Sequence, residues 1–166
     1  MAVLSASKSR PVKLAHGELT FMSIPLAGYT NFAAGTVEHT VYKGSALICD
    51  VSDTDGYFRA CPLSSSVAGA AGDVFGGIAM ERVKVTSADL ADGSKEVTVC
   101  RNGVWGFAVG SLAITDIGAP AFLSDDDTIT TTSTNNYHCG YIEGVDATYV
   151  WVNIEPMFMM LNALTT

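Results

Sequence analysis

The 166-residue sequence has few charged residues, because Asp, Glu, Lys and Arg make up only 16% of it, where about 25% is usual. Hydrophobic residues reach 48%, which excludes a disordered chain, since disorder needs low hydrophobicity and high charge. The net charge of −8 argues against nucleic acid as a direct partner, because phosphate-binding surfaces are basic. So little charge predicts that other protein subunits cover part of the surface.

Signals for membranes and for export are also missing. No run of about 18 apolar residues occurs, so no membrane-spanning helix is expected. The first ten residues contain no apolar stretch after a charged start, so no signal peptide is expected. The four cysteines form no CxxC pair, which excludes zinc-ribbon and redox motifs. We expect four buried free thiols and assembly in a reducing cytoplasm, with two disulfides in a secreted protein as the alternative.

Helical spacing of apolar residues is scarce, and only short helices near residues 63–71 and 88–91 are expected. Valine, isoleucine, threonine and aromatic residues instead cluster in short runs between many of the 16 glycines, which is typical of β-strands. The fold class is therefore all-β, a compact β-barrel or sandwich. The predicted strands are residues 19–24, 36–43, 46–51, 56–60, 74–79, 81–86, 96–101, 104–109, 120–123, 128–132, 138–143 and 148–154.

The dipeptide Asn102-Gly103 separates two of these strands and predicts a tight hairpin, because a type I′ turn favours these residues. In the resulting register Cys100 and Trp105 share one face, whereas Val97 and Val99 share the other. Neither face is polar, so both faces need cover. One face is expected to meet the core, and the other a second sheet or a neighbouring subunit.

The two ends of the chain differ from its middle, so we predict a basic N-terminal arm (residues 1–17), a β-domain (18–155) and an apolar tail (156–166). The arm carries Lys8, Arg10 and Lys13 and no acidic residue. It is either a frayed terminus or an extended arm that lies on an acidic neighbouring surface.

The tail is rich in methionine, and burying each large side chain there is worth about 1.5–3 kcal/mol. The tail is expected either to fold back on its own core or to enter a groove of a partner subunit. The residues concerned are Met157, Phe158, Met159, Met160 and Leu161.

The sequence contains only weak matches to motifs for metal binding, phosphate binding or catalysis. The acidic stretch 50–56 lacks EF-hand ligands, because Val51 and Pro62 fall on the first and twelfth loop positions. Residues 124–127, with three consecutive carboxylates, are expected to form a solvated turn. No phosphate-binding loop or nucleophile elbow is present. We therefore predict no enzyme activity, no metal and no cofactor.

Seven short segments, taken in order, resemble the tailed-bacteriophage capsid decoration (cement) protein family, often described only as a domain of unknown function. The resemblance covers about residues 43–154 and implies a small β-rich protein on the outer capsid surface, often a trimer. It does not extend to the arm or the tail. The segments are residues 72–79, 96–99, 102–107, 117–123, 128–134, 139–143 and 148–153.

The resemblance implies a structural virion protein that binds the major capsid protein and stabilises the assembled shell, without direct contact to nucleic acid or membrane. We expect Lys8, Arg10 and Lys13 to contact the capsid, and the five apolar tail residues to form the interface of a homotrimer. Deletion of residues 2–13 is expected to abolish capsid binding and leave the fold intact.

Two other functions stay open at this stage. A receptor- or glycan-binding head-fibre or adhesin module would expose an aromatic platform, with Trp105 or Trp151 in it, although strand aromatics more often belong to a core or an interface. A β-rich hydrolase would place His39 or His138 beside a serine and a carboxylate.

Overall fold

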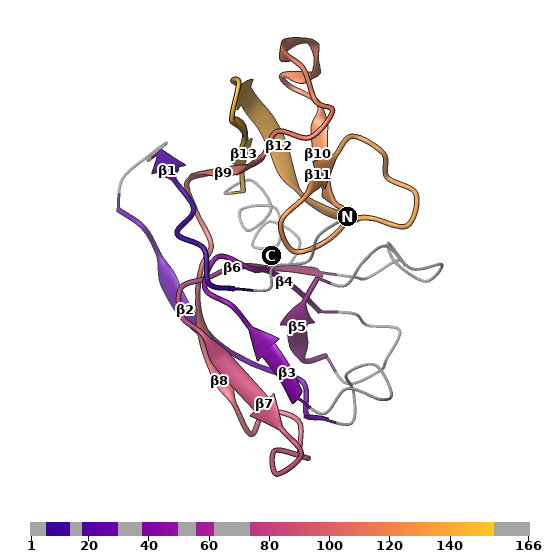
Figure 1. Ribbon diagram of the computed structural model, residues 1–166. Helices are drawn as coiled ribbons and strands as arrows, with labels where there is room; N and C mark the ends of the chain where they lie inside the picture. The colour runs from indigo at the N-terminus through magenta and orange to yellow at the C-terminus, as the bar shows by residue number, and fades with distance from the viewer. Residues whose placement is uncertain (1–5, 14–17, 30–37, 50–55, 62–73, 155–166) are drawn as a thin grey trace, which may run out of the picture.

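The computed structural model describes residues 6–13, 18–29, 38–49, 56–61 and 74–154, and these form three antiparallel sheets (Figure 1). The predicted all-β fold is confirmed. Each of the twelve predicted strands overlaps a strand of the structure. A thirteenth strand, β1, was not predicted, because its two residues are too few to show an alternating pattern. No helix in the described ranges is long and apolar enough to span a membrane.

The largest sheet has six strands. Their order across the sheet is β1 (Val12–Lys13), β9 (Val104–Ala108), β13 (Tyr149–Asn153), β12 (Tyr137–Val145), β10 (Pro120–Leu123) and β11 (Ile129–Thr130).

The second sheet has five strands and the third has two. The order in the second is β2 (Phe21–Pro25), β8 (Glu96–Cys100), β6 (Val74–Ala79), β4 (Ala46–Cys49) and β5 (Phe58–Ala60), and the third pairs β3 (Glu38–Val41) with β7 (Val83–Thr86).

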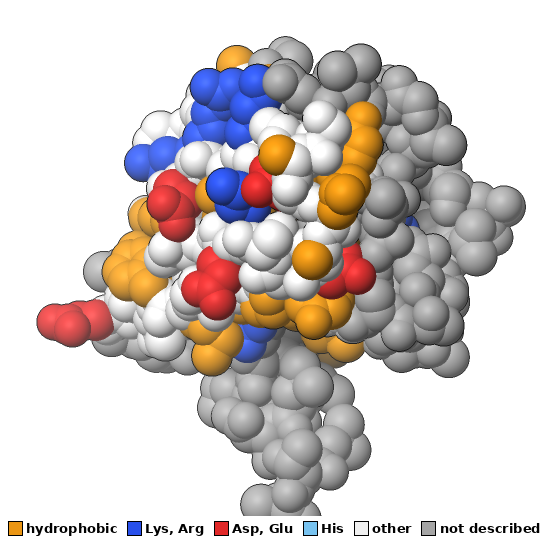
Figure 2. Space-filling model, turned by 90° about the horizontal axis from the view of Figure 1, so that it is seen from below, with side chains coloured by type: hydrophobic (Ala, Val, Ile, Leu, Met, Phe, Trp, Pro, Cys, Tyr) orange, Lys and Arg blue, Asp and Glu red, His pale blue; other side chains and the backbone are white. Residues whose placement is uncertain are grey.

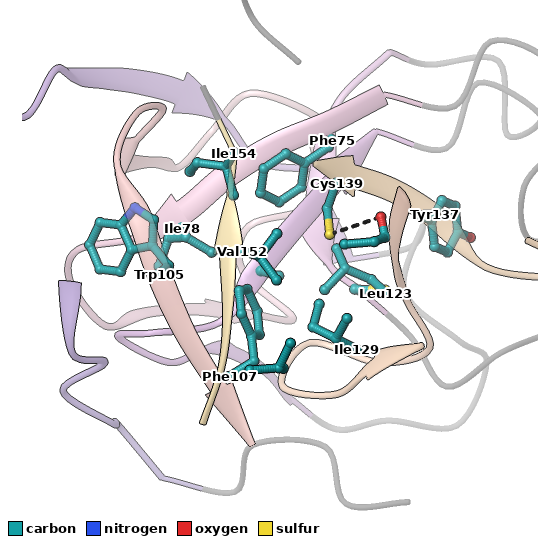
Figure 3. Packing of buried hydrophobic residues seen from close by; sticks show 14 of the residues in the cluster. Phe75, Ile78, Trp105, Phe107, Leu123, Ile129, Tyr137, Cys139, Val152 and Ile154 are labelled. Carbon is teal, nitrogen blue, oxygen red and sulfur yellow. Dashed lines mark hydrogen bonds between the residues drawn. The ribbon is translucent and has the colours of Figure 1, made fainter. Parts of the chain in front are cut away.

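The five-stranded sheet is the middle of three layers, because a hydrophobic cluster lies on each of its faces. The first cluster joins it to the six-stranded sheet, and Figure 3 shows Phe75 and Ile78 among side chains such as Trp105 and Val152. The second cluster joins it to the β3–β7 sheet and includes Val85. The inner strands β4 and β6 are therefore buried on both sides, which explains their continuous apolar runs.

Strand β8 illustrates this double burial. Val97 and Val99 belong to the second cluster, and Cys100 belongs to the first. The prediction that both faces of this segment need cover is confirmed, and of the two sources considered for the outer face, a second sheet supplies it.

The predicted hairpin at Asn102 and Gly103 is wrong. Strand β8 pairs with β2 and β6, whereas β9 pairs with β1 and β13 in the other large sheet. Both edges of β8 are occupied, so β9 cannot pair with it. The turn instead carries the chain from one sheet to the other. A hydrogen bond within this turn segment, from Trp105 Nε1 to Asn102 O at 2.8 Å, stabilises it.

The helix predicted near residues 88–91 is also wrong, because that segment forms turns. Asp89 stabilises them, since its Oδ2 accepts hydrogen bonds from Thr86 N at 3.0 Å and Thr86 Oγ1 at 2.9 Å. A short 3-10 helix, η3 (Ile114–Asp116), lies elsewhere. The other predicted helix, residues 63–71, lies outside the described residues.

Candidate functional site

Residues 6–13, here called the N-terminal strap, pack on the chain's own sandwich. Lys8 N donates to Lys43 O at 2.8 Å, and Gly106 N donates to Pro11 O at 2.9 Å. Strand β1 extends the six-stranded sheet by pairing with β9. The strap is therefore an integral layer of the fold, where an arm reaching toward a neighbour was expected.

Arg10 lies at the centre of the strap, and its side chain has no exposed surface. Its Nη1 lies 2.7 Å from Asp127 Oδ1, its Nη2 donates to Asp126 O at 2.7 Å, and its Nε donates to Gly44 O. The guanidinium carbon lies 4.2 Å from the centroid of the Phe107 ring. Burial lowers the pKa of Arg10, while the charge of Asp127 acts against that shift. Arg10 was predicted as a capsid contact, but in this structure it is enclosed by its own chain.

The acidic turn of residues 124–127 is the partner of Arg10. Asp125 and Asp126 are buried, so the prediction of a solvated turn is wrong. Asp125 Oδ1 accepts from Thr128 N at 2.7 Å, and Asp126 Oδ2 accepts from Ser45 Oγ at 2.7 Å. Lys8 Nζ adds a further ion pair with Asp127 at 3.0 Å. The basic strap therefore compensates the charge of a turn more than 100 residues away in sequence.

Lys13, the third predicted capsid contact, is exposed and lies on the outer face of the six-stranded sheet. Its Nζ is 3.8 Å from the centroid of the Trp151 ring. Trp151 Nε1 donates to Asp146 Oδ2 at 2.7 Å, and this bond lowers the pKa of Asp146. Trp105 is buried in the first cluster. Trp105 therefore offers no exposed ring, and Lys13 covers one face of Trp151.

The five apolar tail residues predicted as a subunit interface, Met157, Phe158, Met159, Met160 and Leu161, lie outside the described residues. The same holds for residues 50–55 of the acidic stretch that was compared with an EF-hand loop.

All four cysteines, Cys49, Cys61, Cys100 and Cys139, are buried and form no disulfide, as predicted. Burial raises the pKa of the Cys61 and Cys139 thiols above the ordinary value. Cys139 donates a hydrogen bond to Ala121 O at 3.4 Å, drawn in Figure 3. These thiols act as small core residues. In the described parts of the chain, no group of three or more His, Cys, Asp or Glu side chains could hold a metal ion.

The two histidines considered for a hydrolase lie on different sheets. His138, on the outer face of β12, contacts the rings of Phe122 and Tyr141 at centroid distances of 5.1 and 5.5 Å. Its Nε2 lies 3.0 Å from Gly140 O. His39 is on β3, opposite Val85 of β7. The contacts of the His138 ring involve aromatic rings and a backbone carbonyl, which is not the arrangement of a catalytic triad.

His39 predicts a pH-dependent stability. Burial, together with the charge of Arg59, lowers the pKa of His39 from 6.5 to about 4. The unfolded chain therefore takes up a proton at higher pH than the folded chain, so stability is lost as the pH falls from 6.5 to 4. Between pH 7 and pH 4.5 we expect urea unfolding to show about 2 kcal/mol more loss for the native chain than for His39→Gln. The matched variant His138→Gln should behave like the native chain; equal losses in all three would contradict the prediction.

Exposed apolar side chains gather where η3 packs beside β12. Ile114, Ile117 and Tyr141 are 72%, 46% and 37% exposed, and Pro120 pairs with Tyr141 across β10 and β12. Hydrogen bonds from Gly118 N to Ile142 O and from Ile142 N to Ala119 O fix the loop to the strand. We call these four residues, Ile114, Ile117, Pro120 and Tyr141, the η3–β12 surface. Figure 1 shows the η3 loop projecting beyond the end of β10.

Among the residues that the structure describes, the other exposed large hydrophobic ones are Val12, Phe21, Met22 and Leu90. On the face shown in Figure 2, hydrophobic side chains form several spots separated by polar and charged ones. The η3–β12 surface was not predicted as a site. Its signal in the sequence is a pair of isoleucines within a stretch that is otherwise small or polar, next to Asp116 and Gly118.

No protein-family model, no curated protein and no solved structure matches this chain.

Proposed function

We propose that this chain is a structural virion protein that binds the outer surface of an assembled phage capsid and stabilises the shell, as a decoration or cement protein. The observation that carries the proposal is the η3–β12 surface, an exposed apolar area that contains three of the exposed large hydrophobic residues of the described chain, Ile114, Ile117 and Tyr141. Ile117 and Pro120 lie in one of the segments that resemble the decoration family, and Tyr141 lies in another. The family-like segments thus supply three of the four residues of the surface that we assign to the capsid, and Ile114 is the fourth.

The η3–β12 surface is small, which favours repeated binding to a lattice over a single contact. A stable interface usually buries about 800 Å² on each partner, and four side chains supply less than that. A homotrimer would present three copies of the surface to neighbouring copies of the major capsid protein and gain avidity from their linkage. The net charge of −8 would keep the decorated particle soluble.

The proposal assigns the capsid contact to a different place from the three basic residues of the strap. Lys8 and Arg10 are paired with Asp127 of the same chain. Deletion of residues 2–13 would therefore disturb the fold as well as any contact, and it does not isolate capsid binding.

The test is co-sedimentation of the full-length protein with empty shells assembled from the major capsid protein of its phage. We expect the native chain to bind and to raise the melting temperature of the shells. The double variant Ile114→Asp/Ile117→Asp should bind at least tenfold more weakly, because charged groups would replace the apolar contact. The matched control is Leu90→Asp, since Leu90 is 59% exposed outside this surface, and it should bind like the native chain.

Failure of the native chain to sediment with shells would overturn the proposed function. Equal binding by the native and double variants would overturn the role of the η3–β12 surface. Light scattering provides a second check, because a homotrimer has three times the chain mass of 17.4 kDa; a monodisperse monomer would count against the trimer.

The alternative, a receptor- or glycan-binding head-fibre or adhesin module, needs an exposed aromatic ring in its predicted form. Trp105 is buried, and Lys13 lies over one face of Trp151. The tryptophans therefore support glycan binding less than the η3–β12 surface supports capsid binding.

A further inference from the structure

A hollow of about 450 Å³ is lined by residues next to the β9, β10 and β11 strands of the six-stranded sheet, and none of its lining residues belongs to the η3–β12 surface. Its walls come from the loop after β9, from the turn between β10 and β11, and from the loop of residues 131–136. This volume falls within the range of small-molecule binding sites, about 300–1,000 Å³.

The lining is rich in neutral hydrogen-bonding groups. Six hydroxyl side chains and two amides line the hollow, and Ile129 is its one large apolar residue among the described ones. None of the described lining residues is ionisable, so the hollow offers no charge to hold a phosphate, a carboxylate or a cation. Hydroxyls and amides both donate and accept hydrogen bonds, which suits a neutral ligand with many hydroxyls. The hydroxyl residues are Ser111, Ser124, Thr128, Thr130, Thr132 and Thr134.

Asn136 contributes to the lining an amide whose orientation is fixed. The residue is 8% exposed, and its Nδ2 donates to Thr132 O at 3.0 Å and to Thr134 O at 2.9 Å. These two bonds fix the orientation of the amide. Its Oδ1 accepts no hydrogen bond from the described residues. A buried acceptor without a donor is unfavourable. Because Oδ1 has almost no exposed surface, a ligand hydroxyl would have to displace part of the 131–136 loop to donate to it.

The wall that carries Asn136 is held by local hydrogen bonds. Asn136 N donates to Ser133 O at 3.2 Å, and Thr132 N donates to Thr130 Oγ1 at 3.1 Å. Asn135 adopts a left-handed backbone conformation with φ of 58°, which asparagine tolerates better than most residues. The side-chain hydroxyls of Ser111, Thr132 and Thr134 are not engaged by these bonds and are available to a ligand.

We propose that this hollow binds a neutral carbohydrate. A sugar presents adjacent hydroxyls that donate and accept together, which matches the array of serine and threonine hydroxyls in the lining. A peptide would need more apolar surface than Ile129 supplies. The inference does not depend on capsid binding, and it places sugar recognition on the 131–136 loop, separate from the tryptophans of β9 and β13.

The test is a titration of the isotope-labelled full-length chain, followed by backbone amide NMR. The probes are methyl α-D-glucopyranoside, methyl β-D-galactopyranoside, N-acetylglucosamine, maltose and lactose, each up to 100 mM. We expect at least one sugar to shift the amides of residues 110–111 and 128–136 saturably, with a dissociation constant in the millimolar range, because no aromatic ring stacks on it. The methyl glucuronide that matches the glucoside should bind several-fold more weakly, since no described cation faces its carboxylate.

Variants identify the hydroxyls responsible. Thr132→Val and Thr134→Val remove one hydroxyl each with little change in shape, and each should weaken binding at least threefold. Thr148→Val, on the exposed turn before β13, is the matched control and should bind like the native chain. The proposal is overturned if no sugar shifts these amides saturably, if both valine variants bind normally, or if a neutral capped peptide shifts them and no sugar does.

Discussion

Replacement of Arg10 by methionine is expected to lower the free energy of unfolding by about 3–5 kcal/mol, because it leaves buried carboxylates without their positive partner. Methionine keeps much of the apolar contact with Phe107 but removes every donor. The bonds to Asp127 Oδ1, Asp126 O and Gly44 O are all lost. Urea unfolding of the full-length chain measures the effect.

The matched control is Arg82→Met, since Arg82 is exposed and its guanidinium lies 5.6 Å from the Tyr42 ring. This variant should lose no more than about 0.5 kcal/mol. The double variant Arg10→Met/Asp127→Asn should recover part of the loss, because the unpaired charge is removed with its partner. Equal midpoints for Arg10→Met and Arg82→Met would show that the buried pair does not hold the strap.

Replacement of Gly140 by alanine is expected to destabilise the fold by about 3 kcal/mol. Gly140 lies in β12 beside the irregularity where the pairing with β10 shifts, and its φ is 153°. An added Cβ would lie 2.1 Å from Asn153 O and 3.0 Å from Asn153 C. Both atoms belong to the backbone of β13, so relief requires the sheet itself to move.

Gly118→Ala separates this steric effect from the loss of backbone freedom. Gly118 has a φ of 88°, and nothing lies within 4 Å of an added Cβ, so only conformational strain remains, about 1 kcal/mol. Thermal and urea unfolding of both variants and of the native chain measure the two losses in the free energy of unfolding. A loss for Gly140→Ala no larger than that for Gly118→Ala would contradict the prediction.

Every described strand except β1 could be predicted from the sequence, because most of them are local runs of β-branched and aromatic residues. Their pairing could not, as β8 and β9 show. Asn102 and Gly103 indicate a tight turn locally, yet β8 is paired on both edges by β2 and β6. Those partners are distant in sequence, so nothing in the hairpin segment indicates that they take precedence.

The candidate sites show the same limit. Three adjacent carboxylates indicate a solvated turn when taken alone, and only Arg10, over 100 residues earlier, makes their burial favourable. Predicting the η3–β12 surface would require knowing which isoleucines stay exposed. The sequence does not show this for apolar residues in loops. The segments that resemble decoration proteins contain part of that surface, but their spacing alone did not identify it.

The strap also affects the order in which the molecule is assembled. Residues 6–13 are translated before the groups that receive Arg10, which belong to Gly44, to β9 and to residues 126 and 127, so the strap cannot complete its contacts until residue 127 has been synthesised. Contacts that close such long loops form slowly. The strap therefore docks after the turn that it neutralises, and before it docks the charge of the carboxylates of residues 125–127 opposes their burial.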